Sequence, residues 1–282
     1  MQARQERRHS TDIPALSHNR DPEIHQLRRR DAALTATERT DFARDGYVVV
    51  RDMLDARAMQ HLDHWTAELQ EAPETPGRHM VYGETSLLDG ETRLIQRIEN
   101  FCPFHDGFDG LVNRGPLIEA ATLLFGEPAV MFKDKINLKM PGGDGFKPHQ
   151  DQQAGWSRYA DLFITALVSI DDATPENGCL EIAPGQHRRG LIGPEWAPLT
   201  PEHTAGFALT LLPTRAGDVV FFDSYVPHSS LPNLTGRQRR VLYVTYNRLS
   251  EGDHRERYFA EKRQNFPPDI EREPGKNYVF RV

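Results

Sequence analysis

A histidine followed two residues later by a carboxylate occurs three times in this 282-residue sequence, as His61/Asp63, His149/Asp151 and His254/Glu256. Residues i and i+2 of a β-strand project from one face, so such a pair could bind a single metal ion, whereas on a helix the two side chains point apart. The first pair falls in a helical pattern, and the third lies in the polar run SEGDHRERY. His149/Asp151, in GFKPHQD after a glycine-rich turn, is therefore the candidate metal-binding pair.

A third ligand should come from a distant strand, and His228 is the best candidate. It follows the apolar run VVFFDSYVP and is expected at the end of a core strand. His187 and His203 are alternatives, but each lies in a loop with no strand leading into it, and His187 is assigned a structural role. Two histidines and one carboxylate on one face of a metal leave three positions open, as in non-haem Fe(II) oxygenases. The residues predict an iron site formed by His149, Asp151 and His228.

Arg239 begins the strand RRVLYVTYN, eleven residues after His228. If the intervening loop closes a hairpin, Arg239 returns beside His228, where its guanidinium could bind the distal carboxylate of a dicarboxylate co-substrate. Because neighbours on a strand face opposite sides, one of Arg239 and Arg240 should point inward and the other outward. The alternative is that these arginines are surface charges at the end of a strand.

The segment 129–140 is expected to be a long strand with one polar and one apolar face. The polar face carries Lys133, Lys135, Asn137 and Lys139. This alternation is typical of a sheet with one solvated face, and equally of a strand whose polar face lines a cavity for anionic ligands. For Lys135 and Asn137 both interpretations remain open.

Helices come first in the chain and short strands follow. Thr35 and Glu38 have the spacing of a capping box, and Gly46 is a helix stop before a strand at 47–50. Further helices are expected at 55–69 and, after a loop, at 92–101 and 116–125. Strands are expected at 129–140, 162–170, 179–182, 208–212, 218–222 and 239–247, separated by Gly/Pro turns. This order predicts an α+β fold with a double-sheet jelly-roll core and N-terminal helices packed on one sheet.

The composition excludes several classes of partner. Lys and Arg total 34 against 41 Asp and Glu, a net charge of −7, whereas a nucleic-acid-binding protein needs a basic face. No apolar run is long enough to span a membrane, and the N-terminus lacks the apolar core of a secretory signal. Cys102 and Cys179 match no metal or disulfide pattern, so they are interpreted as buried thiols in a cytoplasmic protein. The sequence carries no signal for the number of subunits.

One domain with an N-terminal extension is expected. Residues 1–33 are rich in Arg, His and Asp and are interpreted as a partly ordered arm. Residues 34–282 form the single domain, with a β core at about 128–248 and a C-terminal tail at 249–282.

Several of these segments resemble the phytanoyl-CoA dioxygenase family of Fe(II)/2-oxoglutarate oxygenases, over roughly residues 35–250. They are GYVVVRDML, KPHQD, PENGCLEIAPGQHRRG and GDVVFFDSYVPHSS, with the later Arg239. The resemblance implies a double-stranded β-helix (cupin-like) core, iron held by the three residues named above, and 2-oxoglutarate and O2 as co-substrates. It also implies that Arg239 binds the far carboxylate of 2-oxoglutarate with help from Ser230, and Lys135 is expected at the same site. Family members that halogenate lack the carboxylate ligand, so Asp151 implies hydroxylation.

Within that family, KDKINLKMPGGDGFKPHQDQQAGW and TRLIQRIENF are similar to the bacterial phosphonate dioxygenases. Those enzymes hydroxylate 2-aminoethylphosphonate, or its N-trimethyl analogue, at the carbon next to phosphorus, in phosphonate catabolism. Such a substrate needs cationic or amide donors for its phosphonate, for which Lys135, Asn137 and an arginine of the run 28–30, represented by Arg30, are candidates. Trp156 could offer a ring face to the amine, and Asn277 could help close the site.

Two alternatives accompany this hypothesis. The first is a hydroxylase of the same family acting on another small zwitterion, such as ectoine, which would have the same iron site and a different pocket. The second is a metal-binding jelly-roll protein without catalysis. Arg239 argues against the second alternative, because a protein that only binds metal needs no site for a dicarboxylate co-substrate.

Overall fold

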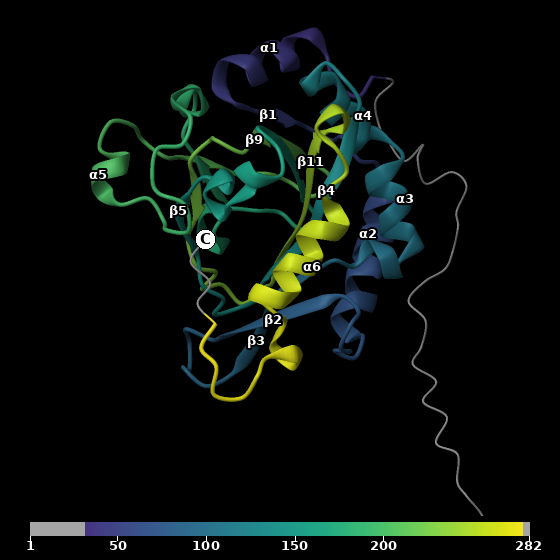
Figure 1. Cartoon of the computed structure of the whole chain (residues 1–282), viewed down its shortest axis with the longest axis vertical. Helices are drawn as coiled ribbons and strands as arrows, with labels where there is room; N and C mark the ends of the chain where they lie inside the picture. Colours follow the sequence, from purple (N-terminus) through teal and green to yellow (C-terminus); the bar gives the residue numbers. More distant parts are fainter. Residues whose placement is uncertain (1–31, 279–282) are drawn as a thin grey trace, which may run out of the picture.

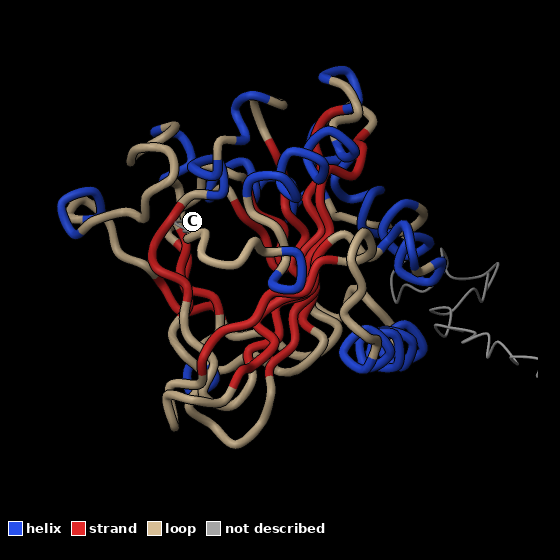
Figure 2. The backbone as a smooth tube through the Cα atoms, turned by 60° about the horizontal axis from the view of Figure 1, so that its bottom comes forward, coloured by secondary structure: helices blue, strands red, loops and turns tan. Residues whose placement is uncertain are grey.

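Two antiparallel β-sheets face each other at the centre of the structure, a computed structural model that describes residues 32–278. The larger sheet has the strand order β1-β9-β6-β11-β4-β3-β2, and the smaller one has the order β5-β10-β7-β8. Helices cover the outer side of the larger sheet, and the smaller sheet lies on its other side (Figure 2). The predicted α+β jelly-roll architecture is confirmed.

The helices and strands have the following bounds. The larger sheet contains β1 (Tyr47–Val50), β2 (Met80–Thr85), β3 (Arg93–Glu99), β4 (Ala129–Lys139), β6 (Phe163–Ser169), β9 (Val219–Asp223) and β11 (Arg239–Arg248). The smaller sheet contains β5 (Phe146–His149), β7 (Leu180–Ile182), β8 (Thr210–Leu212) and β10 (His228–Ser230). The helices are α1 (Ala36–Asp45), α2 (Ala56–Glu71), α3 (Asp106–Asn113), α4 (Pro116–Phe125), α5 (Pro201–Thr204) and α6 (Arg255–Asn265). None of the helices in this part of the chain combines the length and apolar character needed to cross a membrane.

The first part of the chain folds as its local signals predict. Thr35 and Glu38 form the capping box of α1, and the helix ends at Gly46, whose φ of 78° lies in the left-handed region. Apolar side chains of α2, α3 and α4 pack with Ile136 and Leu138 of β4 in one buried cluster. The N-terminal helices therefore lie on the larger sheet, on the side away from the smaller one (Figure 1).

Packing of Ile136 and Leu138 against the helices determines the direction of the polar face of β4. Because the side chains of a strand alternate, Lys135 and Asn137 point the other way, toward the space between the two sheets. In the pairing with β11, Lys135 lies opposite Tyr243 and Lys139 lies opposite Arg239. Of the two interpretations of this strand, the structure supports the cavity-lining one.

The prediction of a helix at 92–101 is wrong, because this segment is β3. Strand β3 pairs with β2 on one side and β4 on the other, so its backbone hydrogen bonds are made across the sheet. The apolar residues Leu94, Ile95 and Ile98 have a spacing that also fits one face of a helix, which explains the error. The side chain of Ile98 packs in the cluster with the helices, whereas the side chains of its neighbours Arg97 and Glu99 point to the other face of the sheet, where the cavity lies.

The place of His228 also differs from the prediction. The apolar run that precedes it is β9 in the larger sheet, and the chain then crosses between the sheets over residues 224–227. His228 begins the separate strand β10 of the smaller sheet, where it pairs with His149 of β5. Helices α3, α5 and α6 and strand β2 were not predicted, and Figure 1 shows α6 lying across β4. Of the predicted arm, Ala33 is buried in the core, and residues 1–31 lie outside the described part of the chain.

Candidate metal centre

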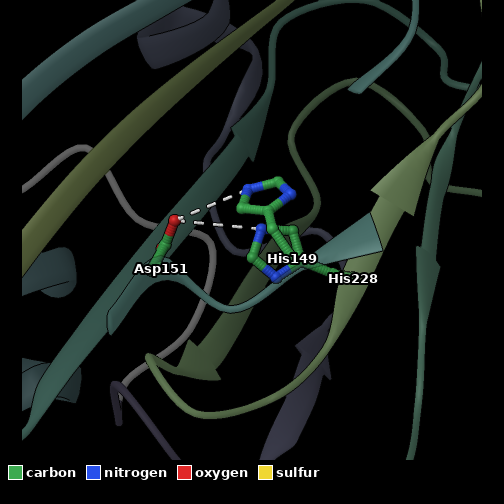
Figure 3. Close-up of side chains that lie close together, drawn as sticks. All are labelled: His149, Asp151 and His228. Atoms are coloured by element: carbon green, nitrogen blue, oxygen red, sulfur yellow. Dashed lines mark ion pairs between the residues drawn. The ribbon is translucent and has the colours of Figure 1, made fainter. Parts of the chain in front are cut away.

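Three predicted ligands converge where β5 and β10 of the smaller sheet lie side by side (Figure 3). His149 ends β5, His228 begins the neighbouring strand β10, and Asp151 lies in the short turn after β5. One carboxylate oxygen of Asp151 lies 4.0 Å from Nε2 of His149 and 3.9 Å from Nε2 of His228. Within residues 32–278, no other group of three or more His, Cys, Asp or Glu side chains converges in this way.

Hydrogen bonds orient all three side chains. Nδ1 of His149 lies 2.7 Å from the carbonyl oxygen of Lys147, and Nδ1 of His228 lies 3.0 Å from that of Val226. A carbonyl can only accept, so each Nδ1 carries the proton and each Nε2 presents its lone pair to the shared point.

The second oxygen of Asp151 is held in the same way. The hydroxyl of Thr165 donates to Oδ2 at 3.2 Å, which leaves Oδ1 for a metal. Burial lowers the pKa of His149 to about 3, and the proximity of His228 adds to this effect. Burial opposes ionisation of Asp151, but the neighbouring imidazoles of His228 and His149 outweigh it and lower the pKa of the carboxyl. The site thus offers two neutral imidazole nitrogens and one carboxylate oxygen on one side of the metal position and leaves the other side open. This set of donor atoms fits Fe(II).

Replacing Thr165 with valine is expected to weaken Fe(II) binding about tenfold, because the side chain keeps its shape but no longer orients Asp151. Anaerobic titration of the protein with Fe(II) measures this effect. Ser169→Ala is a matched control, since it removes a buried hydroxyl of the same strand that bonds Thr214 instead. Equal Fe(II) affinity in Thr165→Val and the wild type would contradict the assigned role of Thr165.

Arg239 and Arg240 face opposite sides of the sheet, as the alternation predicts. Arg240 points outward and forms a two-bond ion pair with Asp171, at 2.9 and 2.7 Å, and a third contact with Asp63 at 2.7 Å. Arg239 points inward and is 3% exposed, and burial lowers its pKa. Its guanidinium pairs with no carboxylate in residues 32–278, and its Nε has no hydrogen-bond partner there. A buried guanidinium without a counter-ion is suited to bind an anionic ligand.

Further polar groups surround Arg239. Tyr243 lies beside both Arg239 and Asn137, and the Asn137 Oδ1 is buried without a partner in the described chain. Across the strands from Arg239, the Lys139 ammonium donates to Ser230 Oγ at 2.8 Å and to the carbonyl of Leu231. Burial lowers the pKa of Lys139 to about 7, and the charge of Arg239 adds to this. The structure thus brings together the predicted residues Arg239, Ser230 and Asn137. Lys139 and Tyr243 lie with them, although the sequence analysis did not assign these two residues to the co-substrate site.

A cavity of about 480 Å³ opens beside His149 and Asp151. Two predicted residues, Lys135 and Trp156, line this cavity. Burial lowers the pKa of Lys135 to about 7. The ring of Trp156 packs edge-on against Phe132 and Phe163. Asn277 is exposed and is not among the lining residues, and Arg30 lies outside the described part of the chain.

Several residues that line this cavity were missed by the sequence analysis. They are Arg97 and Glu99 of β3, Lys262 of α6, and Trp196 of the loop before α5. The alternation of Arg97 and Glu99 about Ile98 was a usable signal, but it was hidden by the helical interpretation of 92–101. Lys262 had no signal, because its position depends on how α6 packs across the sheet.

The remaining candidate histidines have other roles. In α2, His61 stacks on Trp65 at 5.1 Å, while Nε2 of His254 bonds the carbonyl of Glu251. His203 bonds Thr200 at the start of α5. His187 packs close to Gly46 at the end of α1, which agrees with its predicted structural role.

Comparisons with known proteins agree with this geometry. Residues 42–241 match the model of the family described as Phytanoyl-CoA dioxygenase (PhyH). A 2-aminoethylphosphonate dioxygenase from the uncultured bacterium HF130_AEPn_1 is 42% identical over 250 residues, or 86% of this chain and 93% of that protein. A methylphosphonate hydroxylase from Gimesia maris is 36% identical over 237 residues, which are 84% of this chain and 89% of that protein. The crystal structure of EctD from S. alaskensis with 2-oxoglutarate and 5-hydroxyectoine has the same fold, with a TM-score of 0.64, 24% identity and 82% of each chain covered.

Proposed function

Because this chain belongs to the phytanoyl-CoA dioxygenase family, we propose that it hydroxylates a small aminophosphonate at the carbon next to phosphorus. The substrate would be 2-aminoethylphosphonate or an N-methylated form, in phosphonate catabolism. The protein is a 2-oxoglutarate-dependent dioxygenase that uses Fe(II), 2-oxoglutarate and O2. When bound, the iron supplies the oxidising chemistry that replaces a C–H bond by C–OH, coupled to oxidative decarboxylation of 2-oxoglutarate to succinate.

The side chains of the protein position the reactants. We assign His149, Asp151 and His228 as the iron ligands, because their donor atoms converge and their other polar atoms are hydrogen-bonded. Arg239 is assigned to the far carboxylate of 2-oxoglutarate, with Ser230 and Lys135 around the co-substrate site. Asn137, which the sequence analysis assigned to the phosphonate, lies beside Tyr243 and is assigned to the co-substrate site instead. Ser230 is held in place by Lys139. The cavity beside the iron ligands holds the substrate, and Trp156 forms part of its wall.

The observation that carries the substrate proposal is the charge of this cavity. Its lining includes the cations Arg97, Lys133, Lys135 and Lys262, and, apart from Asp151, Glu99 is the only carboxylate that lines it in the described chain. The chain has a net charge of −7, so a concentration of buried cations at this one place indicates an anionic ligand. A phosphonate provides that charge, and both relatives named above act on phosphonates.

Ectoine stays the second candidate substrate, supported by the fold shared with EctD. Ectoine has one carboxylate, so it matches the charge of the cavity less well than a phosphonate dianion. A metal-binding protein without catalysis does not account for the buried guanidinium of Arg239, which forms no ion pair with a carboxylate in residues 32–278. We also propose a cytoplasmic location, which fits the two free, buried cysteines, Cys102 and Cys179.

Succinate formation tests the proposed function. The protein is reconstituted anaerobically with Fe(II), supplied with 2-oxoglutarate, and exposed to air with 2-aminoethylphosphonate, its N-methylated forms, methylphosphonate or ectoine. Succinate formation is expected to be stimulated by the aminophosphonates, with a hydroxyl group found next to phosphorus. Stimulation by ectoine alone would show that the substrate proposal is wrong.

A further inference from the structure

We propose that Trp196 forms the wall that holds the substrate beside the metal centre, and that Gln153 positions this wall. The inference rests on the proposed function, which assigns the cavity beside His149 and Asp151 to the substrate. Trp196 belongs to the loop 190–200, directly before α5. Its side chain lines both this cavity and a second pocket that residues of α6 also line.

The backbone of Trp196 has an unusual conformation. Its φ of 64° lies in the left-handed region, where a bulky side chain is rarely found. The other non-glycine residues with a positive φ in residues 32–278 are Asp52 and Asn100, whose short polar side chains adopt this region more often. A glycine would adopt it without strain, so a tryptophan at this position costs conformational free energy. Strain of this kind indicates that the side chain has a function.

Gln153 holds the loop in this conformation through three hydrogen bonds. Its side-chain amide donates to the carbonyl of Pro194 at 2.8 Å and to that of Ala197 at 2.7 Å, on either side of Trp196. The backbone N–H of Trp196 donates to the backbone carbonyl of Gln153 at 2.7 Å. A single buried residue therefore fixes the turn that carries the indole.

Gln150 connects the same loop with the metal ligands. It directly precedes Asp151, and its side chain accepts from the N–H of Ile192 at 2.7 Å and donates to the carbonyl of Gly190 at 2.8 Å. Its backbone N–H donates to the side-chain oxygen of Gln153 at 2.9 Å. Both glutamines are fully buried, so the loop has a fixed position relative to Asp151.

The indole ring of Trp196 is held in place as well. It stacks on Phe266, directly after α6, with ring centres 5.8 Å apart and planes inclined by 26°. On the metal side it lies against Gly155, where an added Cβ atom would come within 2.3 Å of the ring. Trp196 is 37% exposed and also lines the cavity, so its ring lies at the mouth.

An aromatic ring at the mouth of the cavity restricts the positions that a small substrate can take. The indole offers apolar contact area to the carbon chain and excludes water from it, which helps to hold the reacting carbon at the metal centre. The residues assigned to the far end of 2-oxoglutarate, Arg239 and Ser230, do not line this cavity. A change of Trp196 should therefore affect the substrate and leave the co-substrate unaffected.

The kinetics of Trp196→Gly test the assigned contact, with succinate formation as the readout. Glycine readily adopts a positive φ, so this change removes the ring while the loop keeps its backbone conformation. We expect the KM for 2-aminoethylphosphonate to rise about tenfold, equivalent to about 1.4 kcal/mol of binding. The KM for 2-oxoglutarate and the affinity for Fe(II) should stay within about twofold of wild type, which also shows that the variant is folded.

Two further variants control for the loss of the ring. Trp196→Phe retains an aromatic ring and should keep the KM for 2-aminoethylphosphonate within about threefold of wild type. Leu191→Gly removes an apolar side chain from the same loop, but Leu191 is 39% exposed and does not line the cavity. This variant should have the KM of the wild type.

A double-mutant cycle tests whether Gln153 acts through Trp196. Gln153→Met removes the side-chain hydrogen bonds to the loop, and we expect it to raise the KM for 2-aminoethylphosphonate about fivefold. Added to Trp196→Gly, the same change should raise the KM by less than about twofold, because the ring that it positions is already absent. Independent, multiplying effects of the two changes would overturn the positioning role of Gln153.

The remaining outcomes separate this inference from the proposed function. An unchanged KM in Trp196→Gly, an equal rise in Leu191→Gly, or a parallel rise in the KM for 2-oxoglutarate would overturn the role of Trp196. If ectoine but no phosphonate stimulates the wild type, the proposed function fails, and the KM for ectoine is measured in the same variants. A rise in Trp196→Gly alone would then support the wall, and an unchanged value would overturn it.

Discussion

Asp151→Ala is expected to lower the rate of substrate-dependent succinate formation at least about 1000-fold, a loss of about 4 kcal/mol of transition-state stabilisation. Asp151 provides the only carboxylate oxygen that converges with the two histidine Nε2 atoms in the described chain. Without it, two neutral nitrogen donors remain, and Fe(II) loses the charged ligand of the site. The measurements are succinate formation with saturating co-substrate and the stoichiometry of Fe(II) bound after dialysis.

Asp63→Ala is a matched control for this prediction. Asp63 has the same spacing from a histidine in the sequence, but it lies on α2, is 65% exposed and contacts Arg240 on the outer side of the sheet. We expect its replacement to leave Fe(II) binding and succinate formation within about twofold of wild type, as is usual for surface substitutions. Full hydroxylation by Asp151→Ala would contradict the assignment of the iron site.

The comparison of these two His-x-Asp pairs shows what the sequence can predict. The period of the surrounding residues places His61 and Asp63 on a helix and His149 near the end of a strand, and the structure confirms both. The alternation of β4 is also predictable, because burial of Ile136 and Leu138 fixes the opposite direction for Lys135 and Asn137. These features depend on residues close together in the chain.

Features that depend on distant segments were not predictable. The spacing of the apolar residues in β3 fits a helix, and only pairing with β2 and β4 makes it a strand. His228 reaches the smaller sheet because the chain crosses over at residues 224–227, where the sequence gives no sign of a change of sheet. The contact of Lys262 with Glu99 joins a late helix to an early strand, and it follows from tertiary packing alone.

Arg239→Met is expected to raise the KM for 2-oxoglutarate about 100-fold, because two charge-assisted hydrogen bonds to a carboxylate contribute roughly 3 kcal/mol. Methionine preserves the length and apolar character of the side-chain stem, so the change removes the guanidinium while keeping the packing of β11. The 2-oxoglutarate dependence of succinate formation, at saturating substrate, gives the KM. The iron ligands are untouched, so Fe(II) affinity should stay at the wild-type value.

Arg240→Met separates the loss of a co-substrate contact from the loss of a structural ion pair. Arg240 is the next residue of the same strand, but its guanidinium bonds Asp171 and Asp63 outside the cavity. Its replacement leaves the partly buried carboxylate of Asp171 without its ion-pair partner, so we expect Tm to fall by a few degrees, for a loss of about 1 kcal/mol. The KM for 2-oxoglutarate should not change. Equal KM values in Arg239→Met and Arg240→Met would mean that the inward guanidinium does not bind the co-substrate, because only its position between the sheets distinguishes it from its neighbour.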